Sequence, residues 1–177
     1  WQERARYLPH DPYTIFLRAR IHLMQGERLR ALSLLQSLLG RSMSSAVAEK
    51  VYNLAGQCAR FLGFAAEAVM FYEHARDTAP DLMLCALNAS NVLFNRHYLP
   101  ATLAEEHAAA EAYGALFADV QTFSHKPHDM GRTRPLRIGY LSPDVREHVV
   151  LSFSYALFTA LLPERFSVHV YAMNRED

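Results

Sequence analysis

The sequence predicts a mostly α-helical chain, in which paired helices repeat as a superhelix and are followed by one strand–helix–strand unit. Two observations predict this fold class. Small, aromatic and proline landmarks recur at offsets of 34 to 37 residues through the first two thirds of the chain. After residue 135 the pattern changes to two short β-type runs separated by an apolar helix. We therefore predict three parts: helical repeats at 1–119, a linker at 120–135 and the beginning of an α/β domain at 136–177.

Composition and charge limit the classes of function. The 177 residues carry 18 basic and 18 acidic side chains, and 51% of them are hydrophobic, which is enough to pack a core. A net charge of zero gives no electrostatic footprint for nucleic acid or for an anionic membrane. No run reaches the roughly 18 apolar residues of a membrane span. Cys58 and Cys85 lie in apolar helical patterns, which indicates reduced, buried thiols in a cytoplasmic protein.

The clearest repeat lies between Glu49 and Pro80. Gly56 is a small residue at which a second helix can come close, and Gly63 breaks the chain between the two helices. Tyr72 is placed to fill the space between the helices, and the proline ends the pair. These landmarks are those of a tetratricopeptide repeat (TPR).

Copies of this repeat lie on both sides of it. Upstream, an offset of 37 residues places Ala19 on Gly56 and Gly26 on Gly63. Downstream, an offset of 34 places Ser90 on the first of these glycines, but the returning helix there has lost its landmark residues. Such degeneration is typical of the capping repeat at the end of a superhelix. We expect Ala19, Gly56 and Ser90 to lie at the closest helix crossings.

Two further segments flank the regular repeats. Residues 1–8 indicate the end of a returning helix from a partial first repeat. Residues 120–135 are polar and aperiodic, which predicts the linker. His125 and His128 in this linker have no cysteine or acidic partner at metal-ligand spacing. We interpret them as loop histidines and predict no metal site.

The last part of the chain predicts a βαβ unit. Residues 136–142 and 166–173 are β-type runs, and the apolar residues at 149–162 predict a helix between them. Because this helix is apolar nearly all round, we expect it and the strand edges to promote association with a second copy or with the remainder of a domain. The first strand is not followed by the glycine-rich loop of a dinucleotide-binding site.

The loop after the first predicted strand gathers polar side chains at the strand's carboxyl end, where open α/β sheets bind ligands. Residues 142–148 include two acids, one cation and one histidine. Spacing alone leaves two interpretations open. The loop is either a polar turn in which Ser142 or Asp144 caps the next helix, or a ligand site that uses its acids, its cation and its histidine.

Several motifs, in this order along the chain, resemble the O-GlcNAc transferase and SPINDLY-type family. The segments "RPLRIGYLSPDVREH" and "ERFSVHVYAMNRED" are similar to the first two strands of the family's catalytic domain. The segment "ASNVLFNRHYLP" with the following "EEH" resembles the family's last repeat, and "HKP" resembles its linker. The resemblance implies that the βαβ unit begins a Rossmann-like lobe of a GT-B fold. It also implies transfer of GlcNAc from UDP-GlcNAc, or fucose from GDP-fucose, to Ser or Thr of proteins, without a metal ion.

The same resemblance supplies a candidate catalytic residue. The family histidine after the first strand falls on His148, which would face the donor phosphates and the acceptor hydroxyl. An imidazole there would hydrogen-bond the developing charge or orient the acceptor, and a role as general base stays open. Val145 stands where the family has an aromatic residue, and Ser152 stands where it has a second histidine. The family's donor-binding lobe has no counterpart in these residues, so we expect this chain alone to be inactive.

The repeats imply a binding surface for protein substrates or partners. First helices of TPR pairs line the concave face of the superhelix, and they carry Asn53 and Asn88, our candidate substrate-binding residues. Asn88 has the spacing of an asparagine ladder that holds substrate backbone in the animal enzymes of the family. Leu17 and Leu54 stand at the corresponding positions, so the ladder is not continuous, and solvated surface asparagines are the alternative.

Two classes of function therefore remain open. The first is a protein O-glycosyltransferase whose repeats bind the protein substrate. The second is a non-catalytic TPR protein–protein interaction scaffold, whose α/β part only binds partners. The family histidine at position 148 favours the enzyme.

Overall fold

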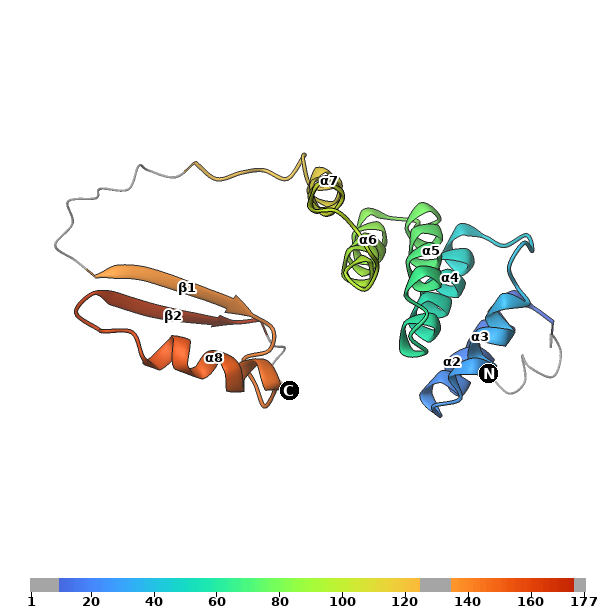
Figure 1. The fold of residues 1–177 in the computed structure, drawn as a ribbon, viewed down its shortest axis with the longest axis horizontal. Helices are drawn as coiled ribbons and strands as arrows, with labels where there is room; N and C mark the ends of the chain where they lie inside the picture. The colour runs from blue at the N-terminus through green and yellow to red at the C-terminus, as the bar shows by residue number, and fades with distance from the viewer. Residues whose placement is uncertain (1–9, 125–134, 174–177) are drawn as a thin grey trace. The chain divides into compact units, whose positions relative to one another are not determined.

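The computed structural model describes residues 10–124 and 135–173. The chain divides into two compact units, Trp1–Gln121 and Thr122–Asp177. The predicted partial repeat at residues 1–8 and the histidines His125 and His128 lie outside the described residues. Within the described ranges the first unit is helical, and the second is a two-stranded sheet with one helix (Figure 1).

In the described part of the first unit the helices follow one another as three pairs (Figure 1). In the described residues the pairs are α2 (Pro12–Met24) with α3 (Arg28–Gln36), α4 (Ser45–Phe61) with α5 (Ala65–Asp77), and α6 (Leu82–Arg96) with α7 (Leu103–Ala115). Contacts run between the members of each pair and from each pair to the next. The prediction of a mostly helical chain built from helix pairs is confirmed.

Local side chains determine where several helices begin. The Asp11 carboxylate accepts a hydrogen bond from the backbone of Thr14 at 3.0 Å, and Pro12 occupies the first turn of α2. At the start of α7, Thr102 and Glu105 form a reciprocal capping box. This cap matters because α7 contains no buried residue, so packing contributes little to its stability.

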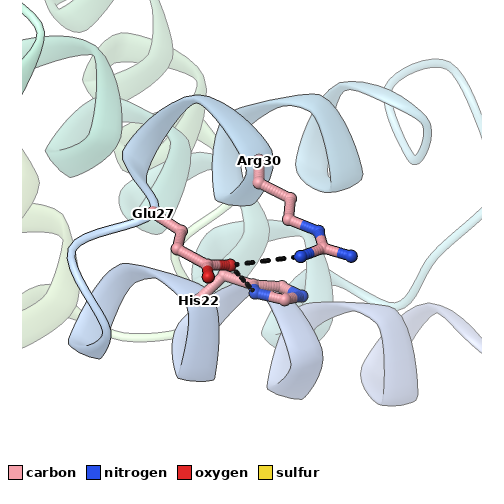
Figure 2. Close-up of polar contacts among 3 residues, drawn as sticks. All are labelled: His22, Glu27 and Arg30. Carbon is pink, nitrogen blue, oxygen red and sulfur yellow. Dashed lines mark hydrogen bonds and ion pairs between the residues drawn. The ribbon is translucent and has the colours of Figure 1, made fainter.

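Glycines with positive φ make the turns inside the first two pairs. Gly26 has φ +80° and Gly63 has φ +82°, a conformation that residues with a Cβ rarely adopt. The first turn is also held by side chains: Glu27 Oε2 lies 2.6 Å from His22 Nδ1 and 3.4 Å from Arg30 Nη1 (Figure 2). The carboxylate thus ties the end of α2 to the first turn of α3.

The core of the first unit is centred on the close approach of α4 and α5. Tyr72 is 1% exposed, and a Cβ built on Gly56 would lie 2.9 Å from its ring. The absence of a side chain at position 56 therefore makes room for the ring, as the repeat pattern predicts. Ala19, at the equivalent position of the first pair, is fully buried.

The equivalent crossing in the third pair differs from the expectation. Ser90 is exposed, whereas its neighbour Ala89 is buried. The offset of 34 places Glu106 on α7 where Tyr72 stands on α5. A charged side chain does not fill the space between helices as an aromatic ring does, so α6 and α7 do not close over Ser90.

The second unit is a parallel βαβ unit. Strand β1 (Leu136–Ser142) pairs with β2 (Phe166–Ala172) in parallel, from Leu136 opposite Phe166 to Ser142 opposite Ala172. Helix α8 (Val149–Thr159) connects them and ends three residues before the predicted end. The Tyr140 and Phe158 rings meet edge to face at 5.0 Å, which packs α8 on the sheet. The predicted strands and their parallel pairing are confirmed.

Helix α8 exposes much of its apolar surface. It contains no buried residue, and the Phe153 side chain is 80% exposed. On the strands, Leu141 and Tyr171 are also more than half exposed. An apolar surface of this kind is typical of an interface. The expected association of this unit with a second copy or with the remainder of a domain stays a prediction.

We predict that Gly56→Ala destabilises the protein by about 1–3 kcal/mol, because its Cβ would collide with the buried Tyr72 ring. Thermal unfolding measures the change. Gly114→Ala in α7 is the matched control: no atom lies within 4 Å of the added Cβ, so the change should be neutral or stabilising by up to about 1 kcal/mol. Tyr72→Leu should reduce the cost of Gly56→Ala. An equal cost in both backgrounds would contradict this contact.

We also predict that the two cysteines differ in reactivity. Cys58 is fully buried, and desolvation raises the pKa of its thiol from 9.0 to about 11, whereas Cys85 is half-buried. At pH 8 an alkylating reagent should modify Cys85 in the native protein and Cys58 only after unfolding. The Cys85→Ser variant leaves Cys58 as the remaining thiol, and rapid labelling of that folded variant would contradict the prediction.

Burial of Cys58 also makes stability depend on pH. Because the pKa of this thiol is higher in the folded than in the unfolded protein, its contribution to the free energy of unfolding should fall as the pH rises from 9 towards 11.

Candidate functional site

The first helices of the three pairs line a groove of about 350 Å³, which we call the first-helix groove. Helices α2, α4 and α6 each supply part of its wall, as expected for the binding face of helix-pair repeats. Its lining combines cations, one acid, amides and apolar side chains: Phe16, Arg20, Glu49, Lys50, Asn53, Leu54, Gln57, Leu84 and Leu87.

A chain of side-chain hydrogen bonds joins α4 to α6 at this groove. Asn88 Nδ2 donates to Glu49 Oε1 at 2.9 Å and to the Leu84 backbone carbonyl at 2.9 Å. Asn53 Nδ2 donates to Asn88 Oδ1 at 2.6 Å, and Gln57 Nε2 donates to Asn53 Oδ1 at 2.7 Å. Asn88 is fully buried and Glu49 is 3% exposed, so the network satisfies polar groups that water does not reach.

The two candidate asparagines therefore occupy different environments. Asn88 is buried, and both of its amide hydrogens and its carbonyl oxygen are engaged within the protein. Asn53 lines the groove, and the network uses only one of its two amide hydrogens. Substrate binding by these residues stays a prediction, and the geometry places only Asn53 where a ligand could reach it.

Sequence reasoning missed four polar residues of the groove, namely Arg20, Glu49, Lys50 and Gln57. A signal for them was present. Glu49, Asn53 and Gln57 follow one another at four-residue spacing, which places them on one face of α4. The offset of 37 residues carries Gln57 back to Arg20 on α2. Following the four-residue spacing on both sides of Asn53, and then the repeat offset, leads to Glu49, Gln57 and Arg20.

In the second unit, His148 is the N-cap of α8. Its Nδ1 accepts a hydrogen bond from the Val150 backbone N–H at 3.2 Å, and its own backbone is extended with φ −150°. Ser142 Oγ accepts from the Asp144 backbone N–H at 3.1 Å, which closes the turn after β1. The expectation that Ser142 or Asp144 caps the helix is therefore wrong, because the histidine takes that position.

The cap determines which proton His148 carries. A neutral imidazole that accepts at Nδ1 holds its proton on Nε2, so Nε2–H is a hydrogen-bond donor. The side chain is exposed, six residues beyond the carboxyl end of β1. In this arrangement the Nε2–H of His148 can donate to an oxygen of a ligand, while Nδ1 is used by the helix cap.

Two negative findings hold for residues 10–124 and 135–173. Within these ranges, His, Cys, Asp and Glu side chains do not gather in groups of three that could hold a metal ion. In the same part of the chain, no helix is long and apolar enough to cross a membrane.

We predict that Asn88→Leu destabilises the protein by about 2–4 kcal/mol, because Glu49 would stay buried without its donor. Asn91→Leu is the matched control, since that half-buried residue lies on the same helix outside the network; it should change stability by less than about 0.5 kcal/mol. Replacing Glu49 and Asn88 together with leucine should recover much of the loss. Chemical denaturation measures all three, and additive costs for the pair would contradict the coupling.

The fold was compared with solved structures. It matches a mutant of the Thermobaculum terrenum O-GlcNAc transferase with a TM-score of 0.69 and 21% sequence identity, over 98% of this chain and 33% of that chain. The present chain thus spans about a third of the length of that structure. No protein-family model matches the sequence, and no curated protein matches it at a significant level. The resemblance that the motifs predicted is confirmed at the level of the fold: helical repeats followed by the βαβ unit that begins a GT-B lobe.

Proposed function

We propose that this chain joins a protein-binding repeat unit to the first part of a nucleotide-sugar transferase, which moves a sugar to Ser or Thr hydroxyls of proteins. One observation carries the proposal. Helical repeats and a parallel βαβ unit follow one another here in the same order as in the O-GlcNAc transferase structure, over 98% of the chain. The donor in this proposal is UDP-GlcNAc or GDP-fucose, bound without a metal ion.

In this proposal the first-helix groove holds the protein acceptor. Its amides at Asn53 and Gln57 can hydrogen-bond the backbone of an extended segment, whose N–H and C=O groups need partners once water is displaced. The network behind these amides fixes their orientation before a ligand arrives. Pre-orientation lowers the entropy that binding must otherwise overcome.

His148 has the role of a hydrogen-bond donor in this proposal, because its Nδ1 is engaged by the helix cap. Its Nε2–H is directed to an oxygen of the sugar donor's phosphates or of the acceptor. A donor at this position stabilises negative charge that develops as the nucleotide leaves. This role needs no proton transfer to the imidazole.

A non-catalytic scaffold is the second candidate, and one observation favours it. The first-helix groove is lined by repeat residues alone and does not require the α/β unit. A scaffold and an enzyme therefore share the same binding surface and differ only in sugar transfer.

The decisive experiment measures transfer by the longer protein that contains this chain. The purified protein is incubated with radiolabelled UDP-GlcNAc or GDP-fucose and with a protein extract, and label in the protein fraction is counted. Incorporation that is released by β-elimination identifies a sugar on Ser or Thr. If extract proteins bind but neither donor gives incorporation, the transferase proposal is rejected in favour of the non-catalytic scaffold.

We predict that His148→Ala lowers transfer by about 10- to 100-fold, through loss of the Nε2–H contact. His148→Asn is the matched control, because asparagine is a good N-cap but does not reach as far as Nε2. The asparagine variant should keep the stability of the parent and lose transfer as the alanine variant does. Near-normal transfer by His148→Asn would reduce this histidine to a helix cap.

A further inference from the structure

The charges that line the first-helix groove are unbalanced. Arg20 and Lys50 are exposed on its wall, and neither forms an ion pair with any residue in the described ranges. The groove's one acid, Glu49, is 3% exposed and bonded to Asn88. Among the described residues that line the groove, a ligand therefore meets two positive charges and no accessible negative one.

The two cations lie on the α2 side of the groove. The Lys50 ammonium lies 5.7 Å from the centre of the Tyr13 ring, so this side chain of α4 leans across to α2. Arg20 follows Tyr13 by seven residues, which is two helical turns on the same face of α2. At a rise of 1.5 Å per residue this separates the two positions by about 10 Å along the helix. Three residues of an extended peptide span about the same distance.

The opposite wall of the groove is apolar. Leu84 and Leu87 come from α6, and Leu87 is 51% exposed. The offset of 34 residues carries Lys50 to Leu84 and Asn53 to Leu87, so equivalent positions change from charged and polar on α4 to apolar on α6. This change gives the groove a direction, from a cationic side at α2 to an apolar side at α6.

We propose that the first-helix groove selects an acidic, extended protein segment, with two carboxylates about three residues apart on the Arg20 and Lys50 side and an apolar residue on the Leu87 side. The inference rests on the proposed binding of protein by the repeats and names the class of acceptor or partner. In this proposal the amides of Asn53 and Gln57 bind the backbone of the segment, whereas the cations and leucines of the groove contact its side chains.

The test uses fluorescence anisotropy with the whole chain and two labelled peptides. The first has two glutamates three positions apart, followed by two leucines and a serine. The second has lysines in place of the glutamates. The acidic peptide should bind at least about tenfold more tightly than the basic one, and its affinity should fall between 50 and 300 mM salt, values chosen to span strong and weak screening. Equal binding of both peptides would overturn the proposal.

Charge reversal at single positions locates the site. Arg20→Glu and Lys50→Glu should each weaken binding of the acidic peptide by about fivefold or more. Arg18→Glu is the matched control: it makes the same charge change on an exposed residue of α2 that does not line the groove, and it should alter binding by less than about twofold. The double variant Arg20→Glu, Lys50→Glu should prefer the basic peptide. Equal effects of Arg18→Glu and Arg20→Glu would overturn the assignment.

Two further experiments distinguish this inference from a general anion site and from the proposed function. A single-stranded oligonucleotide that displaces the acidic peptide would show a general anion site and contradict the selection of protein. Transfer to acidic and basic acceptor peptides is then compared in the longer protein. Transfer without charge preference would defeat the inference and leave the proposed function standing. Charge-selective binding without transfer from either donor would defeat the enzyme and leave the groove assignment intact.

Discussion

The contact between the Tyr72 ring and the bare backbone of Gly56 sets the geometry of the repeat unit. A Cβ at position 56 would lie 2.9 Å from the buried ring, so this approach of α5 to α4 requires a glycine or a shift of the ring. Helix α5 in turn packs on α6. The spacing of α4 and α5 therefore also affects the position of α6, which supplies Leu84 and Leu87 to the first-helix groove.

Burial of polar groups supplies a second constraint. Apolar packing is non-directional, so by itself it specifies the position of α6 relative to α4 less sharply than hydrogen bonds do. The bonds from Asn88 to Glu49 and Asn53 require each partner at one place, and a displaced helix would leave buried groups unsatisfied. The network thus fixes the register of the two first helices. The side-chain amides of Asn53 and Gln57 belong to this network, so their positions in the groove are fixed as well.

Much of the fold could be predicted because it depends on local residue type. The β-type runs located both strands, and the glycine at position 63 located a turn that needs positive φ. Ser90 and Asn88 could not be placed in the same way. An offset aligns Ser90 with Gly56 and Glu106 with Tyr72, but it does not report that the serine is left exposed while its neighbour Ala89 is buried. Likewise, Asn88 is buried because of Glu49, 39 residues away, which no local pattern reveals.

The helix cap at His148 shows how one hydrogen bond changes the chemistry expected of a candidate residue. Ser142 and Asp144 are residue types that commonly cap helices, so the loop's composition pointed to them. The chain instead uses Ser142 to close the turn after β1 and leaves the cap to the imidazole. That single bond satisfies a free N–H group of α8 and, by occupying Nδ1, assigns the proton to Nε2. If His148 took up a proton on Nδ1, it would lose the cap bond from Val150. If it donates a hydrogen bond from Nε2–H instead, the cap bond is kept. The hydrogen bonds of this loop therefore favour a donor over a base at position 148, and the role of His148 in transfer stays a prediction.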